Sequence, residues 1–173
     1  MGGVVKRKGL SVVPHLKEHS QVWLDVGCGN NKQENCIGMD RRKVEGVDVV
    51  HDCEVLPWPF GGEKFHRIVM SHLMEHIKPW LVIDIMNEMW RVMKPGGVLM
   101  MVMPYPGSYG HWQDPTHIKP WNEATARYFD PDCPDLYTIY KPSPWKLEGC
   151  AWRSDGNIEF VMRKRDKEYK PVV

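Results

Sequence analysis

Three carboxylates and a glycine turn follow short apolar runs early in the chain. Asp25 is followed by Gly27 and Gly29, whereas Asp40 and Asp52 each close an apolar run. Asp40 could accept hydrogen bonds from two ribose hydroxyls and Asp52 from an adenine amino group, while Asp25 could hold a cationic amino group. Glycines let a backbone turn tightly and approach a ligand closely. Since carboxylates repel phosphates, the pattern favours a neutral nucleoside that carries an ammonium group.

The glycine turn departs from the dinucleotide pattern. Gly-x-Gly after a strand is shared by nucleotide-binding proteins in general, but the third glycine of Gly-x-Gly-x-x-Gly is missing. A dinucleotide places its pyrophosphate on the helix that begins at that glycine. A nicotinamide-dependent oxidoreductase is therefore a weak alternative.

A second group of reactive side chains lies between Pro104 and His117. The stretch is too rich in glycine and proline for a strand or helix, and it contains His111, Asp114 and His117. His117 or His111 could deprotonate a nucleophile, with Asp114 orienting the ring. The same His-x-x-Asp-x-x-His spacing could hold a divalent metal, or these residues could simply order the loop. The sequence leaves these three interpretations open.

His72-Leu73-Met74-Glu75-His76 matches the inverted zincin motif, His-x-x-Glu-His. That motif requires a long helix, which places both histidines against one metal ion. Here it follows an expected strand and directly precedes Lys78-Pro79. We therefore predict no zinc peptidase and assign no metal-binding residues.

The elements that would position these groups are read from periodicity and from turn residues. Short β-rich runs predict strands, and apolar residues at three- and four-residue spacing after Pro79 predict a helix that Pro95 stops. The expected strands are 22–26, 37–39, 47–50, 65–70 and 98–103, with a hairpin of 145–152 and 157–163; the expected helices are 79–93 and, more weakly, 12–18 and 122–128. These elements predict an α/β sheet, mostly parallel, with ligands beyond the carboxyl ends of its strands.

The order of these motifs resembles the class I S-adenosylmethionine-dependent methyltransferases of the type 11 methyltransferase-domain group. The matching stretches are Leu24–Gly29, Gly38–Asp40, His51-Asp52, Ser71–His76 and Trp90–Gly97. The resemblance implies a Rossmann-like, mostly parallel seven-stranded sheet that ends in an antiparallel hairpin strand. It also implies S-adenosyl-L-methionine as cofactor, S-adenosyl-L-homocysteine as product and methyl transfer as the reaction.

The resemblance also implies a cofactor site. Asp25, Gly27 and Gly29 would form the loop on the methionine side, Asp40 would bind the ribose, and the Asp52-Cys53 region would touch adenine. Ser71 and His72 would line the pocket floor. With neighbouring residues, the expected cofactor-binding set is Asp25, Gly27, Cys28, Gly29, Asn30, Lys32, Asp40, Arg41, Asp52, Cys53, Ser71 and His72.

One departure from the family concerns the first connections. Parallel strands need a connection of about a dozen residues or more, usually with a helix. The segment between Val26 and Ile37 and the segment Arg41–Gly46 are both shorter than that. We predict that the helices flanking the first three strands are reduced to turns. Lys32 would then lie in a loop, where it could pair with the cofactor carboxylate. A three-turn helix between Asn30 and Cys36 would contradict this prediction.

Length and composition restrict the organisation of the chain. The 173 residues carry a formal net charge of +1 and five cysteines, so neither a strong attraction to nucleic acid nor a disulfide framework is expected. We expect one methyltransferase domain with an N-terminal extension or helix (1–20), a cofactor-binding core (21–103), a substrate loop (104–121), a C-terminal helix and hairpin (122–164) and a tail (165–173). No apolar run could span a membrane, and free thiols indicate the cytoplasm.

The acceptor is poorly specified by the sequence, because the donor methyl group is already activated and the enzyme mainly supplies orientation. Base-methylating enzymes carry Asn/Asp-Pro-Pro-Tyr/Phe or Pro-Cys where this chain has Ser71–Met74. We expect a small metabolite or glycan with an oxygen or nitrogen nucleophile. RNA or protein is the alternative, supported by the basic stretches Lys6–Lys8 and Arg163–Arg165, and a non-catalytic donor-binding subunit is a third possibility.

Overall fold

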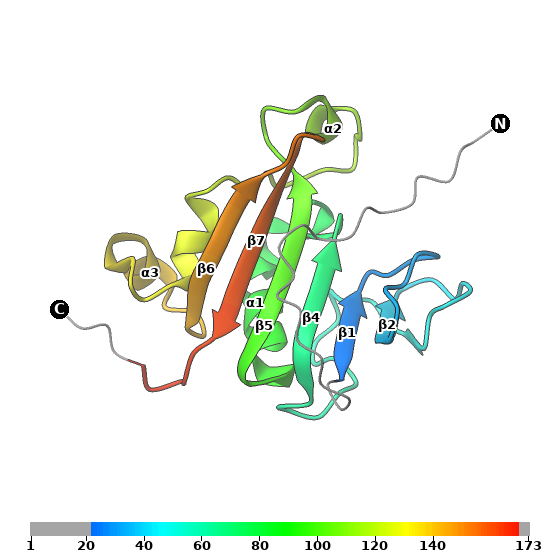
Figure 1. Cartoon of the computed structure of the whole chain (residues 1–173), viewed down its shortest axis with the longest axis horizontal. Helices are drawn as coiled ribbons and strands as arrows, with labels where there is room; N and C mark the ends of the chain where they lie inside the picture. The colour runs from blue at the N-terminus through cyan, green and yellow to red at the C-terminus, as the bar shows by residue number, and fades with distance from the viewer. Residues whose placement is uncertain (1–21, 170–173) are drawn as a thin grey trace.

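The computed structural model describes residues 22–169, and these residues form a seven-stranded sheet. The strands are β1 (Trp23–Val26), β2 (Cys36–Asp40), β3 (Val49–Val50), β4 (Phe65–Ser71), β5 (Met93–Pro104), β6 (Trp145–Trp152) and β7 (Asn157–Lys164). Their order is β3-β2-β1-β4-β5-β7-β6, and β7 runs antiparallel to both of its neighbours. The expected Rossmann-like sheet with an antiparallel hairpin strand is thereby confirmed (Figure 1).

One helix packs behind the centre of this sheet. Helix α1 (Val82–Val92) follows a 3-10 turn, η2 (Pro79–Leu81), and lies behind β4 and β5 in Figure 1. Its inward face carries Ile85, Met86 and Met89, which are fully buried. Alternate residues of the strands share one face, so the buried apolar side chains at every second position of β1, β4 and β5 meet this helix. The core thus fixes the central strands, and polar groups lie at the carboxyl ends of these strands.

The connections between the first strands are short, as predicted. Residues 27–35, all of them described, contain no helix, and residues 41–48 likewise consist of turns and bends. Strand β3 is shorter than the expected 47–50, because Val47 turns back to donate its amide to the Val44 carbonyl and Asp48 donates to the Gly38 carbonyl. The reduced first half of the sheet therefore presents loops where a helix would otherwise cover it.

Other element boundaries differ from the sequence-based expectations. Helix α1 stops at Val92, because Met93 already has extended geometry and begins β5 beside Phe65. The weak helix expected at 122–128 is a 3-10 helix, η3 (Thr125–Phe129). The helix expected at 12–18 lies outside the described residues. Two short helices were not predicted, α2 (Tyr109–Trp112) and α3 (Pro134–Tyr140), and α2 lies inside the stretch that was expected to have no helix.

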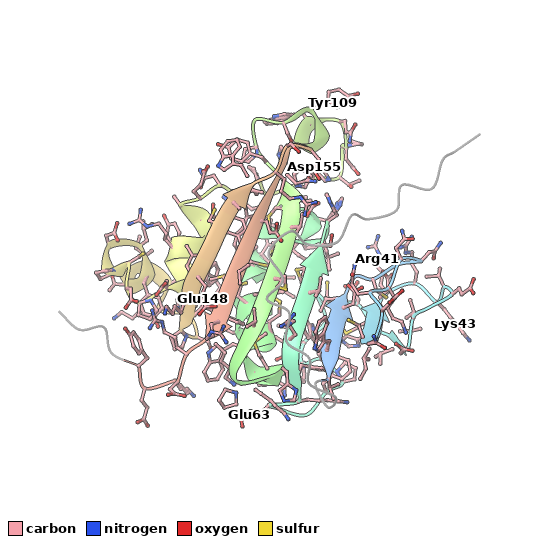
Figure 2. All side chains as sticks on the ribbon, viewed as in Figure 1. Arg41, Lys43, Glu63, Tyr109, Glu148 and Asp155 are labelled. Carbon is pink, nitrogen blue, oxygen red and sulfur yellow. The ribbon has the colours of Figure 1, made fainter. Side chains whose placement is uncertain are left out.

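The carboxyl edge of the parallel strands gathers the loops that carry the candidate site. Figure 2 shows Arg41, Tyr109 and Asp155 toward this edge and Glu63 at the opposite one. Arg41 follows β2, Tyr109 begins α2, and Asp155 lies in the turn between β6 and β7. Within residues 22–169, no helix combines the length and apolar character needed to cross a bilayer.

Candidate active site

A cavity of about 790 Å³ lies at the carboxyl ends of β1, β2 and β4. Its wall begins with the glycine turn after β1, where Gly27 and Gly29 adopt left-handed φ angles of 68° and 52°. A Cβ atom at Gly27 would lie 2.6 Å from Cδ2 of Leu73, so a side chain there would collide with Leu73. The amide of Gly27 donates to the carbonyl of Met39, which fixes the turn against β2. The glycines therefore allow a backbone cradle that a ligand can approach closely.

Asp40 presents a carboxylate at the floor of this cavity. Its side chain is 7% exposed, and Oδ2 accepts a hydrogen bond from the Gly29 amide at 2.9 Å. Oδ1 accepts from the amide and from Nε of Arg42, at 2.9 and 3.2 Å. Burial alone would raise the pKa of Asp40, but these hydrogen bonds outweigh it and hold the pKa below its ordinary value. A carboxylate has about four acceptor positions, and these three bonds leave one of them open on Oδ2. A second hydroxyl can bind Oδ1 where the exposed Arg42 side chain turns away.

The opposite wall comes from the loop after β3. Asp52 and Cys53 line it together with Glu54. The amide of Glu54 donates to Asp52 Oδ1 at 3.0 Å, and Glu54 itself pairs with Lys78 Nζ at 2.6 Å. The loop is anchored below by Trp58, whose Nε1 donates to the carbonyl of Cys53 at 2.9 Å. This wall could therefore offer a carboxylate and backbone groups to a planar base.

Nine of the twelve predicted cofactor-binding residues line the cavity; they are Gly27, Cys28, Gly29, Asn30, Asp40, Arg41, Asp52, Cys53 and His72. The other three, Asp25, Lys32 and Ser71, are absent from its lining. Asp25 is fully buried, and its Oδ2 accepts from the Gln33 amide at 2.8 Å, so it holds the loop from beneath. Lys32 pairs with Asp48 at 2.8 Å. In this structure Asp25 and Lys32 thus interact with the chain itself and not with the cavity.

Sequence reasoning missed several cavity residues, among them Arg42, His51, Glu54, Lys78 and Ile118. Arg42 could have been found from its place beside Asp40 at the end of β2. Ile118 reaches the cavity because its amide donates to the carbonyl of Glu75 at 2.8 Å, a contact between distant segments that leaves no local signal. The cavity lining carries three carboxylates and three cationic side chains, so their formal charges balance. They are Asp40, Asp52 and Glu54 against Arg41, Arg42 and Lys78.

The cysteines of the site are held as thiols. Burial raises the pKa of Cys28 to about 11, with further contributions from the nearby charges of Asp25 and Asp40. Burial likewise raises the pKa of Cys53 to about 12. Since the thiolate is the nucleophile, these cysteines are inert at neutral pH. Cys28 and Cys53 contribute small side chains to the cavity lining.

This difference in thiol environment predicts the labelling pattern of the native chain. At pH 8, a disulfide exchange reagent should react first with Cys133 and Cys150, the two cysteines that are not buried, and more slowly with Cys150, because partial burial raises its pKa. The buried Cys28, Cys36 and Cys53 should react only on the timescale of unfolding. A spectrophotometric time course checks this, with the Cys133→Ser/Cys150→Ser variant as control. A rapid phase that persists in that variant would contradict the burial described here.

His72 stands at the junction of this cavity with a second one of about 380 Å³. It has a left-handed φ of 54°, which is unusual for a residue with a side chain and is typical of functional sites. Its amide donates to the carbonyl of Val102 at 2.8 Å, so the strained turn is anchored on β5. Because η1 (Met74–His76) is a single 3-10 turn, the long helix of the inverted zincin motif does not form.

The second cavity is lined by the 104–121 loop and by the turn between β6 and β7. His117 and Asp114 line it, but His111 does not: its ring is 3% exposed and packs against His117 and Trp112. Burial lowers the pKa of His111. Asp114 Oδ1 accepts from the amide and hydroxyl of Thr116, so this carboxylate caps a turn.

The hydrogen bond that orients the ring of His117 is made with a backbone carbonyl rather than with Asp114. Nδ1 of His117 lies 2.7 Å from the carbonyl oxygen of His111, which can only accept a hydrogen bond. The ring is therefore oriented by that carbonyl, and Nε2 is left with its lone pair. Asp114 Oδ2 lies 3.8 Å from the same Nε2, on the side that faces the cavity.

Comparisons with known proteins identify the family and the fold of this chain. The family described as "Methyltransferase domain" matches residues 5–134. A solved S-adenosylmethionine-dependent methyltransferase from Archaeoglobus fulgidus is similar, with 18% identity, a TM-score of 0.63, and 84% of this chain and 87% of that chain covered. Comparison with curated proteins finds no significant match.

Two further solved structures share the fold. One is the 1,6-didemethyltoxoflavin-N1-methyltransferase of Burkholderia thailandensis, solved with bound 1,6-didemethyltoxoflavin and S-adenosylhomocysteine (12% identity, TM-score 0.60, 84% of this chain and 72% of that chain). The other is a complex that contains the Haloferax volcanii Trm112 methyltransferase activator (12% identity, TM-score 0.59, 84% of this chain and 83% of that chain). With the family match extending over most of its length, this chain belongs to the methyltransferase domain family.

Proposed function

We propose that this chain binds S-adenosylmethionine in the larger cavity and transfers its methyl group to an oxygen or nitrogen of a small metabolite or glycan. The observation that carries the proposal is that His72 and His76 belong to the lining of both cavities, so a ligand in each would meet there. When bound, S-adenosylmethionine supplies an activated sulfonium methyl group. The chain then has mainly to align donor and acceptor and to exclude water.

The larger cavity fits such a cofactor in size and in donor set. Its volume lies within the range of small-molecule sites. Asp40 would bind the ribose hydroxyls, the glycine turn would approach the methionine moiety, and the wall of Asp52 and Cys53 would contact adenine. A side chain at Gly27 would close the cradle, which supports a ligand lying against this backbone.

The smaller cavity supports a small acceptor. Its volume of about 380 Å³ would hold a molecule of modest size, and its lining is largely polar. His117 lines it, and a neutral ring keeps its lone pair on Nε2 because Nδ1 donates to the His111 carbonyl. We assign to this Nε2 the contact with the acceptor's hydroxyl or amine. This takes up the predicted role of His117, with the His111 carbonyl replacing Asp114 as the orienting group.

Calorimetry with S-adenosylhomocysteine tests the cofactor assignment, followed by transfer of tritiated methyl groups to metabolite, glycan, RNA and protein fractions. We expect binding, and label in the metabolite or glycan fraction. Label confined to RNA or protein would contradict the small acceptor. Binding without transfer to any fraction would favour a donor-binding subunit, and tighter binding of a nicotinamide dinucleotide would overturn the whole assignment.

A further inference from the structure

Glu75, His76 and His117 converge at the boundary between the two cavities, and we propose that they form a binding site for a divalent transition-metal ion. Each offers one ligand atom, and these atoms all lie within 4.8 Å of one another. Glu75 and His76 come from η1, and His117 comes from the 104–121 loop. Glu75 and His76 belong to the His-x-x-Glu-His motif and His117 to the His-x-x-Asp-x-x-His motif. The site replaces the assignment of no metal-binding residues.

The buried carboxylate of Glu75 is the strongest reason for an ion. The side chain is 1% exposed, and neither oxygen receives a hydrogen bond from residues 22–169. The nearest nitrogen atoms of an ion-pairing group are Nδ1 of His72 at 3.5 Å and Nε2 of His117 at 4.0 Å, both beyond hydrogen-bond length. Burying a carboxylate without hydrogen bonds is costly. A cation between Glu75 and the histidines would compensate that charge directly.

The ring of His117 is already oriented as a metal ligand. Its Nδ1 must donate to the His111 carbonyl, 2.7 Å away, so a neutral ring keeps a lone pair on Nε2. That nitrogen is the one that faces Glu75 and Asp114. Metal-bound histidines usually donate their other ring N–H to a carbonyl or carboxylate, which fixes the tautomer.

His76 is fixed in the same way by Thr116. Its Nδ1 lies 3.0 Å from the Thr116 hydroxyl oxygen and 3.2 Å from the Thr116 carbonyl oxygen. The hydroxyl donates its own proton to Asp114 Oδ1 at 2.7 Å, so towards His76 it acts as an acceptor. Nδ1 of His76 therefore carries the proton, and the lone pair lies on Nε2. Each of the two imidazole rings then keeps a lone pair on Nε2, and both rings lie beside the Glu75 carboxylate.

The ligand set indicates the class of ion. Two imidazole nitrogens and one carboxylate suit Zn²⁺, Fe²⁺ or Co²⁺, whereas Mg²⁺ and Ca²⁺ prefer oxygen ligands. In a tetrahedral site the ligand atoms lie about 3.3 Å apart, so His117 and Glu75, now 4.0 Å apart, would close slightly on the ion. Three protein ligands leave a position open.

The open coordination position would face the smaller cavity. All three ligands line the smaller cavity, so a fourth ligand would come from there. An ion would then stand between His117 and the acceptor and take over the contact assigned above to Nε2. That use of the ion rests on the proposed function, whereas binding of the ion does not.

Titration of the chelator-treated, dialysed full chain with Co²⁺, followed by visible absorption, tests the site. We expect one Co²⁺ per chain, displaced by Zn²⁺. Glu75→Gln and His117→Ala should each weaken Co²⁺ binding by about 100-fold or more. His66→Gln is the matched control, since His66 lies at the opposite end of β4 and should bind Co²⁺ like the unaltered chain. Absence of Co²⁺ binding, equal binding by all variants, or displacement by equimolar Mg²⁺ would overturn the proposal.

Thermal melting separates a metal ligand from a residue that merely supports the fold. Without metal, Glu75→Gln should melt no lower than the unaltered chain, because it removes a buried charge that receives no hydrogen bond from residues 22–169. Co²⁺ should raise the melting temperature of the unaltered chain and leave that of Glu75→Gln unchanged. A metal-free Glu75→Gln variant that melts lower, with no Co²⁺ effect on either protein, would identify Glu75 as structural. Parallel calorimetry with S-adenosylhomocysteine tests the proposed function separately.

Discussion

Replacing Asp40 with alanine should weaken the binding of S-adenosylhomocysteine by about 100-fold. A hydrogen bond to a charged group contributes about 1.5–3 kcal/mol, and the proposed site gives Asp40 two ribose hydroxyls. The alanine also releases the Gly29 amide and the Arg42 side chain, both of which Asp40 now holds in the cavity wall. Isothermal titration calorimetry of the two proteins under identical conditions measures the effect.

Asp48→Ala is the matched control for Asp40→Ala. Asp48 also holds this part of the chain together, since its Oδ2 accepts from the Gly38 amide at 2.7 Å and from Lys32 at 2.8 Å. It does not line the cavity. We therefore expect Asp48→Ala to lower stability and to leave binding nearly intact. Equal losses of affinity in both variants would mean that Asp40 acts only through the loop, and the ribose assignment would fail.

The positions at strand ends could be predicted because two local signals coincide there. Each apolar run that stops at a polar residue predicts a strand and its carboxyl end, and parallel strands bring those ends to one edge. Asp40, Asp52 and His72 all line the cavity for this reason. The missing helices before β2 and β3 followed from the short connections in the same direct way.

The direction in which individual side chains point was harder to predict from the sequence. Asp25 lies between Leu24 and Val26, whose side chains face the core, so strand alternation turns its carboxylate to the other face. That alternation was present in the sequence, but the motif suggested a ligand contact. The partner of Lys32 depends on where Asp48 folds back beside Gly38, which no local pattern indicates.

Contacts between distant segments account for the rest. The short η1 turn and the 104–121 loop meet because the amides of Ile118 and Lys119 both donate to the carbonyl of Glu75. That pairing brings His117 to Glu75 and takes Asp114 into a turn with Thr116 instead. A spacing such as His-x-x-Asp-x-x-His records which groups are near in sequence. Which of them share a cavity is decided by the partner segment.

Replacing Glu88 of helix α1, a residue that lines neither cavity, should cause a large loss of stability. Its side chain is almost fully buried, and Oε1 accepts from the Trp58 amide at 2.6 Å. Arg91 donates to Glu88 at 2.6 and 2.8 Å and also to the carbonyl of Phe60 at 3.0 Å. Glu88 therefore fastens the loop that follows Cys53 to the helix behind the sheet.

Glu88→Ala should lower the free energy of unfolding by about 3 kcal/mol, the lower end of the range for breaking a buried pair, because Arg91 is partly exposed. Glu88→Gln should lose less, since its amide oxygen can still accept from Trp58. Chemical denaturation of each variant measures both effects. Asp84→Ala is the control, an exposed carboxylate on the same helix, and should change stability by well under about 1 kcal/mol. A similar loss in Asp84→Ala would show that α1, and not this pair, is responsible.

The pH dependence of the Glu88 effect has a definite sign. Burial would raise the pKa of Glu88, but hydrogen bonds from Arg91 and from the Trp58 amide outweigh it and hold the pKa below the ordinary 4.5. A carboxyl whose pKa is lowered by folding contributes its full stability above its unfolded pKa and loses it as the pH falls through the folded value. The difference in stability between the unaltered chain and Glu88→Gln should therefore be constant near neutrality and shrink below about pH 4.5.

Glu88→Ala should also weaken the binding of S-adenosylhomocysteine, because Glu88 holds Trp58 and Trp58 donates to the carbonyl of Cys53. Calorimetry measures the affinity. A variant that loses stability but keeps its affinity would show that this loop does not position the cavity wall of Asp52 and Cys53.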